Sequence, residues 1–356
     1  MTNIALLGFG TVGSGVAEVL TQNSKRIADT IGLDLNIKYI LDLREFPNHP
    51  LGNRVVHDFN IILNDPEVSV VVEMMGGVHP AYDFSMAAIK AGKNVVTSNK
   101  AVVAAFGPEL LTEARKQGVR YLFEASVGGG IPIIRPLTEQ ATRDEITEIA
   151  GILNGTTNYI LTAMKETGVS FDEALATAQK LGYAEADPSA DVDGFDSCRK
   201  ICILAAVAFG TLIPYEKVKT VGIRAITAKD VDEAEQNDCA IKLVARAVRT
   251  DAGIYLSVEP TAVRRGNPLY AIEDVFNGIL VRSKVSGDLM FYGKGAGMLP
   301  TAGAVVSDIL DIAAKGSQQP IQPLWTRDES AYRPMTDLPC EAAESAAKEL
   351  GQALSR

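Results

Sequence analysis

The sequence has 356 residues, of which 47% are apolar and 22% are charged, so it is long enough for two domains and able to bury a sizeable core. The formal net charge is −10, which argues against a nucleic-acid partner because binding to a phosphate backbone needs a basic face. Only three histidines occur, which excludes a histidine-rich metal centre and leaves acid–base chemistry to Lys, Asp, Glu or Tyr.

The first third of the chain alternates short apolar strands with helices. The β-branched residues of 68–74 are typical of a strand buried on both faces. This alternation predicts an α/β fold with a Rossmann-type, doubly wound parallel sheet. The predicted strands are 3–7, 35–42, 68–74, 93–97 and 119–124, and the predicted helices are 11–22, 80–92 and 108–117.

From about Ile131 the helices lengthen and the strands become sparser, which predicts a second domain of the α+β class. Strands are expected at 254–262 and 278–285, and helices at 301–314 and 340–354. We expect residues 1–132 to form the first domain and residues 133–302 the second. The segment from about 303 to 356 is expected to pack back on the first domain.

The four cysteines form no C-x-x-C pair, so neither a zinc site nor a disulfide framework is predicted. The chain does not begin like a secretory signal peptide, and it has no apolar run of about 18 residues. We therefore expect a cytoplasmic protein without a membrane span.

A glycine-rich turn, Gly8-Phe-Gly10-Thr-Val-Gly13, follows the first predicted strand and opens the first helix. In a dinucleotide fingerprint the first glycine permits a tight bend, the second lets backbone approach a pyrophosphate and the third allows close helix–strand packing. The helix N-terminus adds free N–H groups and a favourable dipole for phosphates. A tight turn without a ligand is the alternative, but the strand–helix context favours a dinucleotide site.

Asp42 ends the second predicted strand, where an acidic residue normally binds the ribose hydroxyls. Arg44 follows two residues later and is suited to a 2′-phosphate instead. These two residues leave the choice between NAD and NADP open.

The densest polar segment is a predicted loop from Gly182 to Gly194, followed by a helix that is apolar on every side and therefore buried. Asp196 and Lys200 lie four residues apart where that helix begins. An exposed salt bridge is the usual explanation of such a pair. A partly desolvated lysine held by a carboxylate is the functional alternative. Five carboxylates between Glu185 and Asp196 lack EF-hand spacing and suit an ammonium-bearing substrate such as an amino acid.

At every fixed position, the segment 178–200 matches the pattern A-x3-G-aromatic…D-P-x2-D-aliphatic-x-G-x-D-x3-K, and here the sequence closely resembles homoserine dehydrogenase. The resemblance runs from Gly8 to about Asp308. Further segments similar to family blocks, in the same order, are Gly76-Gly77 with Pro80-Ala81, Thr97-Ser-Asn-Lys100, 124–132, Asn154-Gly-Thr-Thr-Asn-Tyr159-Ile, Gly222-Ile-Arg-Ala-Ile, and Gly295-Ala-Gly297 with Pro300-Thr301.

The resemblance implies NAD(P)-dependent interconversion of L-aspartate 4-semialdehyde and L-homoserine, a step toward threonine, methionine and isoleucine. It implies Lys200 as proton donor and acceptor, with Lys100 as second choice. The substrate-binding residues implied by the family are Glu185, Asp191, Asp196 and Thr156. The implied cofactor contacts are Phe9, Thr11, Val12, Lys100, Gly182 and Gly297, beside the three glycines of the turn.

The family also implies a monovalent cation, Na⁺, held by main-chain carbonyls at Glu124, Val127, Gly129 and Ile131, and a homodimer. Many members carry a C-terminal ACT domain that senses threonine. Only 46 residues follow Leu310 here, so we expect no such domain.

Other functions remain as alternatives. A sugar or inositol dehydrogenase shares the first-domain architecture, but its lysine and histidine arrangement is missing. An aspartate-semialdehyde dehydrogenase needs a catalytic Cys–His pair, and all three histidines lie before Pro80. A redox-sensing regulator would use the same glycine turn without the carboxylate–lysine group. A further alternative is another Rossmann-type oxidoreductase acting on a small amino or hydroxy substrate.

Overall fold

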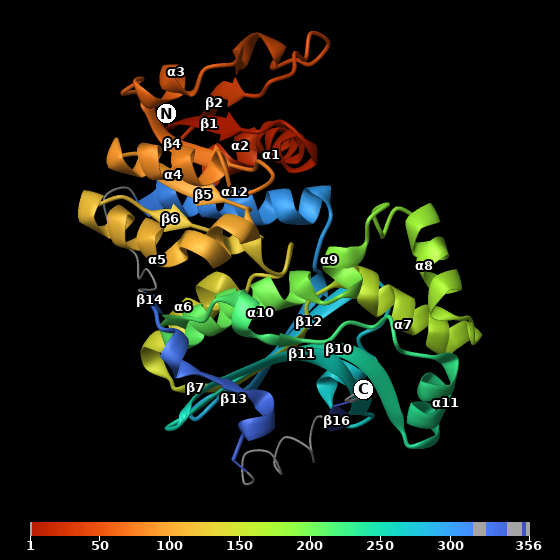
Figure 1. Ribbon diagram of the computed structural model, residues 1–356. Coiled ribbons are helices and arrows are strands. Elements are labelled where there is room, and N and C mark those ends of the chain that lie inside the picture. Colours follow the sequence, from red (N-terminus) through yellow and green to blue (C-terminus); the bar gives the residue numbers. More distant parts are fainter. Residues whose placement is uncertain (1, 316–324, 340–350, 354–356) are drawn as a thin grey trace. The chain divides into compact units, whose positions relative to one another are not determined.

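The computed structural model describes residues 2–315, 325–339 and 351–353, and the chain forms two compact units (Figure 1). The first comprises Met1–Thr138 and Ala296–Trp325, and the second comprises Glu139–Gly295 and Thr326–Arg356. The first segment of the first unit ends at Thr138, inside helix α6 (Ile134–Arg143) and six residues after Pro132. The helix starts in one unit and ends in the other.

The first unit is built on a parallel six-stranded sheet, as predicted. Its strand order reverses at the junction of the first and fourth strands, which defines a doubly wound sheet. The central strands are buried on both faces because they consist mainly of Ile, Leu and Val. In spatial order the strands are β3 (Val55–Val56), β2 (Leu35–Leu41), β1 (Thr2–Leu7), β4 (Val68–Glu73), β5 (Asn94–Thr97) and β6 (Tyr121–Leu122).

The helices of this unit are α1 (Thr11–Gln22), α2 (Ser24–Ile31), α3 (Phe59–Leu63), α4 (Ala81–Lys90), α5 (Lys100–Gln117) and α12 (Met298–Lys315). Helix α1 packs beside α12, and α4 packs beside α5 (Figure 1). Right-handed crossovers on either side of the reversal point place α1 and α4 on opposite faces of the sheet. One apolar cluster joins β1, α1 and α12 through residues such as Leu6, Val16 and Val305.

Two predicted elements differ from the structure. Helix α5 starts at Lys100 rather than at Pro108, because the Asn99 side chain accepts hydrogen bonds from the backbone N–H groups of Ala101 and Val102 at 3.1 and 3.2 Å. Pro108 lies inside this helix. The predicted strand 119–124 shrinks to β6, since the chain turns into a 3₁₀ segment at Glu124–Ser126.

The second unit has a mixed sheet covered by helices, which confirms the predicted α+β class. Its strands are, in spatial order, β13 (Gly287–Lys294), β12 (Phe276–Ser283), β7 (Ile146–Ile152), β10 (Cys239–Thr250), β11 (Gly253–Arg264) and β15 (Tyr332–Pro334), with β9 (Lys219–Thr220) and β16 (Gly351–Ala353) also paired to β11. Its helices are α7 (Gly155–Thr167), α8 (Phe171–Lys180), α9 (Ser189–Val192), α10 (Phe195–Phe209) and α11 (Ala228–Gln236). Strand β10 was not predicted, because Lys242 and Arg246 interrupt its apolar pattern although both are largely buried.

The segment after residue 302 divides between the two units. Helix α12 and the Trp325 ring, which lies against Gly107 of α5, belong to the first unit. From Thr326 onward the chain differs from the prediction, since β14 (Thr326–Arg327) pairs with β8 (Thr211–Leu212) and β15 pairs with β11. Of the predicted helix 340–354, residues 340–350 and 354 lie outside the described residues, and 351–353 form β16 instead.

Candidate functional site

The turn from Gly8 to Gly13 joins β1 to α1 at the carboxyl edge of the parallel sheet. Gly8 has a φ of 92°, which a side chain would strain. A Cβ at Gly13 would lie 2.2 Å from the Gly8 carbonyl oxygen, so the packing of α1 on the turn requires a glycine. A Cβ at Gly10 would meet nothing within 4 Å, and its φ is −82°. The protein itself therefore does not require a glycine there, but close approach of a pyrophosphate does.

The other predicted cofactor residues of this turn contribute in different ways. The Phe9 ring is buried against Phe46 and His49, which leaves its backbone at the turn. Thr11 is exposed at the first position of α1, and Val12 packs against the apolar core. Gly297 has a φ of 118° and directly precedes α12.

Asp42 binds the turn and Arg44 together. One carboxylate oxygen accepts from Phe9 N and Arg44 Nη2, each at 2.9 Å or less, and the other accepts from Arg44 N and Nε at 3.0 and 2.9 Å. The hydrogen bonds from the Arg44 side chain are the main reason why the pKa of Asp42 lies well below its ordinary value. All four lone-pair positions of this carboxylate are thus used.

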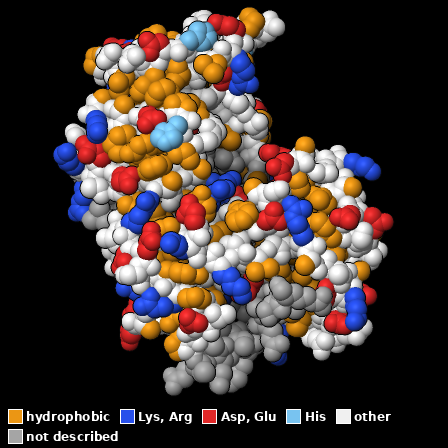
Figure 2. All heavy atoms as spheres, viewed as in Figure 1, with side chains coloured by type: hydrophobic (Ala, Val, Ile, Leu, Met, Phe, Trp, Pro, Cys, Tyr) orange, Lys and Arg blue, Asp and Glu red, His pale blue; other side chains and the backbone are white. Residues whose placement is uncertain are grey.

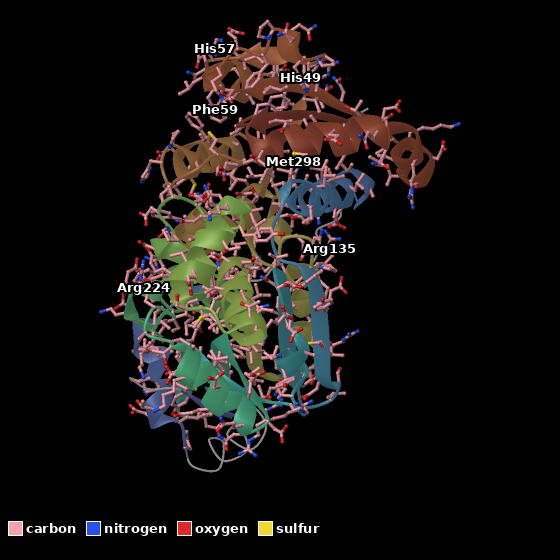
Figure 3. All side chains as sticks on the ribbon, turned by 90° about the vertical axis from the view of Figure 1, so that its right-hand side faces the viewer. His49, His57, Phe59, Arg135, Arg224 and Met298 are labelled. Atoms are coloured by element: carbon pink, nitrogen blue, oxygen red, sulfur yellow. The ribbon has the colours of Figure 1, made fainter. Side chains whose placement is uncertain are left out.

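A pocket of about 410 Å³ adjoins the turn and is lined by Gly8, Gly10, Asp42 and Arg44 together with apolar side chains. His57 and Phe59, labelled in Figure 3, also line it. The His57 ring is hydrogen-bonded to Glu45 Oε1 at 2.8 Å and to the Asp42 carbonyl oxygen at 2.7 Å. These two hydrogen bonds raise the pKa of His57. The volume suits part of a dinucleotide rather than a single ion.

A buried hydrogen-bond network connects the loops after β4 and β5. The Asn99 amide donates to the carbonyl oxygens of Gly77 at 2.7 Å and Met75 at 3.2 Å. The fully buried Glu73 accepts from Thr97 Oγ1 at 2.6 Å and Met75 N at 2.7 Å, and burial raises the pKa of Glu73. This network fixes the start of α5, where the half-buried Lys100 lies. The sequence did not predict that Glu73 and Asn99 position these loops, because their hydrogen-bond partners come close only in the folded chain.

The segment from Glu124 to Ile131 makes a compact turn in the first unit. The Glu124 carboxylate accepts from the backbone N–H groups of Ile133, Ile134 and Arg135 at 2.6 to 2.9 Å and so caps α6. Gly128 and Gly129 have φ values of 81° and 55°, which let the chain fold back on itself. In the described part of the chain no backbone N–H donates to the carbonyls of Val127, Gly129 or Ile131, so these oxygens retain lone pairs.

Asp308 of α12 joins this turn from the other side. Its carboxylate accepts from Glu124 N at 2.9 Å and from the guanidinium of Arg135, labelled in Figure 3, at 2.9 Å. Burial, followed by the charge of Glu124, raises the pKa of Asp308 to about 7. The Glu124 side chain is therefore a structural group, whereas the predicted cation ligands here are carbonyl oxygens.

In the second unit, Lys200 lies in the first turns of α10. Its Nζ donates to Asp196 Oδ2 at 2.6 Å and to the Leu153 carbonyl at 2.7 Å. Only 10% of the Lys200 side chain and 7% of the Asp196 side chain are exposed, so the exposed salt bridge is the wrong explanation of this pair. An ammonium has three N–H groups. Among the described residues it makes these two hydrogen bonds, which leave the third N–H for a substrate oxygen.

Asn154 links this pair to a further carboxylate. Its amide donates to Asp191 Oδ1 at 2.7 Å and to Asp196 Oδ2 at 2.9 Å. Burial and the nearby charge of Asp196 raise the pKa of Asp191. Thr156 donates to the Tyr183 carbonyl at 2.6 Å and so ties α7 to the acidic loop. Asn154 had no role in the sequence interpretation, although an asparagine directly before a helix is a recognisable cap.

The carboxylates of the acidic loop divide into two groups. Asp193 pairs with Arg224, labelled in Figure 3, at 2.5 Å, and Asp187 accepts from Ser189 Oγ at 2.6 Å. These two shape the loop, which corrects the expectation that all five carboxylates face a ligand. Glu185 is exposed, as is Gly182, whose φ of 76° ends the preceding helical segment.

The surface and the helices give two further findings. On the face shown in Figure 2, acidic and basic side chains are interspersed rather than segregated. No helix in the part of the chain that the structure describes is long and apolar enough to cross a membrane.

A doubly wound sheet with a fingerprint turn, and a second unit with a desolvated Lys–Asp pair, define the class of dinucleotide-dependent oxidoreductases. Family models agree in both halves of the chain. Residues 8–124 match the model described as homoserine dehydrogenase, NAD binding domain, and residues 132–310 match the one described as homoserine dehydrogenase.

Individual relatives extend the match over most of the chain. Homoserine dehydrogenase of Synechocystis is 45% identical over 314 residues, which cover 87% of this chain and 72% of the relative. The structure of a homoserine dehydrogenase from Thiobacillus denitrificans has a TM-score of 0.88 at 38% identity and covers 94% of this chain and 80% of its own. A hyperthermophilic archaeal homoserine dehydrogenase mutant in complex with NADPH has a TM-score of 0.76 at 29% identity, over 88% and 98% of the two chains. The chain belongs to the homoserine dehydrogenase family.

Proposed function

We propose that the protein interconverts L-aspartate 4-semialdehyde and L-homoserine with a nicotinamide cofactor, and that Lys200 transfers the proton. The observation that carries this proposal is the buried Lys200 ammonium, fixed by Asp196 and the Leu153 carbonyl with one N–H still to donate. The nicotinamide cofactor, when bound, supplies the hydride to the aldehyde carbon in one direction and accepts it in the other.

Lys200 acts on the substrate oxygen. As negative charge develops on that oxygen, the ammonium stabilises it and then donates a proton. In the reverse direction, the lysine removes the hydroxyl proton. Asp196 accepts from Lys200 Nζ and fixes the position of the ammonium. Lys100, at the start of α5, is the second candidate for this proton transfer.

Three carboxylates suit the cationic end of the substrate. Asp191 and Asp196 lie on the two sides of the Asn154 amide, and Glu185 is exposed on the same acidic loop. An amino acid carries an ammonium group that binds such carboxylates through charge-assisted hydrogen bonds. We assign Thr156 to this site as well, because it ties the loop to α7.

The pocket of the first unit favours NADP over NAD. A ribose hydroxyl must displace Arg44 to reach Asp42, whose acceptor positions are filled. A 2′-phosphate instead pairs with the Arg44 guanidinium, which is 61% exposed, and with His57 when protonated. The pyrophosphate is assigned to Gly8, Gly10 and Gly13, with backbone contacts at Phe9, Thr11 and Val12. The remaining cofactor contacts are assigned to Lys100, Gly182 and Gly297.

A monovalent cation is proposed at the turn containing Val127, Gly129 and Ile131, with the carbonyl of Glu124 as a fourth ligand. The buried carbonyl oxygens of this turn are hard ligands with free lone pairs, which fits Na⁺ better than a transition metal. The cation would stabilise the turn that precedes α6. We further propose that the protein works as a cytoplasmic homodimer.

The direct test is formation of NADPH from NADP and L-homoserine by the purified chain, compared with L-serine, L-threonine and sugars. The proposal expects rapid reduction with L-homoserine alone. Reduction with a sugar but not with L-homoserine would contradict it. Replacing sodium in the buffer by a tetraalkylammonium salt tests the cation, since loss of thermal stability is expected without it.

A further inference from the structure

The segment that follows β7 makes hydrogen bonds to Lys200 and to the two carboxylates beside it, Asp191 and Asp196. Leu153 contributes a carbonyl to Lys200, and Asn154 contributes its amide to two carboxylates. Asn154 is only 5% exposed. An amide whose two N–H groups lie between a buried carboxylate, Asp196, and a half-buried one, Asp191, is a specific arrangement, because each carboxylate gains a donor without a second positive charge.

The two ends of the Asn154 side chain have separate tasks. Its Oδ1 accepts from Thr157 N at 2.9 Å, which makes Asn154 the N-cap of α7. Its Nδ2 has two hydrogens, and both are donated, one to Asp191 and one to Asp196. Capping alone is equally well served by Ser or Asp. Bridging two acceptors requires the amide.

Asp196 Oδ2 accepts from both Lys200 Nζ and Asn154 Nδ2, at 2.6 and 2.9 Å. A shift of this oxygen therefore moves the ammonium. Burial, followed by the nearby charge of Asp196, raises the pKa of Asp191, and the amide between the two carboxylates offsets their mutual repulsion. The titratable groups around Asn154 are these two carboxylates, from α9 and α10, and Lys200, from α10.

We propose that Asn154 is a positioning residue for the proton transfer, acting by fixing Asp191 and Asp196 relative to Lys200. The inference rests on the proposed function, since it assigns a role within the same reaction. Asn154 itself does not contact the reacting atoms in this account. Its loss misplaces the lysine and removes one support of the substrate ammonium.

The test uses Asn154→Ser, which keeps a capping oxygen but removes both amide donors, and Asn154→Asp, which keeps size and cap but replaces the donors by a negative charge. Asn154→Ser is expected to lower kcat by ~10–100-fold, because small misplacements of catalytic groups have effects of that size. It should also raise KM for L-homoserine, while the Kd for NADP stays unchanged.

Asn154→Asp gives a pH signature that a structural role does not. A third carboxylate raises the pKa values of its neighbours, so the acid limb of the kcat/KM profile should move upward by about one unit or more. Asn158→Ser is the matched control, since Asn158 lies four residues further along α7 and donates instead to the Ile272 and Phe276 carbonyls. It is expected to lower thermal stability without moving the pH profile.

Near-normal kcat/KM in a folded Asn154→Ser protein would overturn the inference, as would an unshifted acid limb for Asn154→Asp. If Asn154→Ser does not fold, the Asn154→Asp profile decides alone. Inactivity of the unsubstituted protein with L-homoserine would instead contradict the proposed function, so the two failures are distinguishable.

Discussion

The two units build their candidate sites from different parts of the chain. In the site proposed for the first unit, backbone groups of a glycine turn face the cofactor, and the Asp42 side chain holds that turn in place through Phe9 N. In the site proposed for the second unit, side chains face the substrate, and Asn154 and the Leu153 carbonyl bind those side chains. A backbone-built site is vulnerable to added atoms. A side-chain-built site is vulnerable to removed ones.

The largest effect is expected for Lys200→Ala. Removing the ammonium leaves the developing oxygen charge without its proton donor, so kcat should fall by ~10²-fold or more. Stopped-flow or steady-state rates of NADPH formation measure this loss of kcat. The control is Lys180→Ala, since Lys180 is an exposed lysine of α8. Near-normal turnover would contradict the role of Lys200 as proton donor and leave Lys100 as the candidate.

Glu185→Ala tests the substrate side of the second unit. Losing a charged hydrogen-bond partner of the substrate ammonium should raise KM for L-homoserine by about tenfold, with a smaller change in kcat. Asp187→Asn is the control, because Asp187 is bonded within the loop to Ser189. An unchanged KM would remove Glu185 from the substrate site.

Gly10→Ala tests the opposite vulnerability. The added methyl group meets no protein atom within 4 Å, so the melting temperature should not change. The methyl does occupy the space that a pyrophosphate needs, so the Kd for NADP should rise by about tenfold. Gly13→Ala, whose Cβ would lie 2.2 Å from the Gly8 carbonyl oxygen, should instead lower stability as well. Equal affinity of Gly10→Ala and the parent protein would contradict the assignment of the pyrophosphate.

Arg44→Ala is expected to have the smallest effect. An exposed guanidinium contributes modestly to phosphate binding, so the Kd for NADP should rise about fivefold. The Kd for NAD should fall or stay constant, because Asp42 is released for the ribose.

The raised pKa of His57 means that its positive charge is present at low pH and is lost as the pH rises through that pKa. NADP affinity should therefore weaken as the pH rises, while NAD affinity does not. Parallel changes for both cofactors would reject the 2′-phosphate assignment.

The same contrast explains what the sequence could predict. The parallel sheet and the glycine turn were predictable, because strand and helix periodicity and a local glycine spacing specify them. Asp196 and Lys200 were predictable too, since they lie one helical turn apart. The roles of Asn154 and Asp191 were harder to assign, because the Asn154 amide, which follows β7, binds Asp191 of α9 and Asp196 of α10, and only the fold brings these positions together. The pairing of Asp193 with Arg224 and the path of the chain after Thr326 depend on tertiary contacts in the same way.

The central claim is that one unit binds the cofactor with its backbone and the other transfers the proton with a side chain. Fluorescence titration of NADPH into the Lys200→Ala protein tests it most directly. The account predicts a Kd within a few-fold of the parent value in a protein that no longer oxidises L-homoserine. A Kd that rises in proportion to the loss of turnover would contradict it.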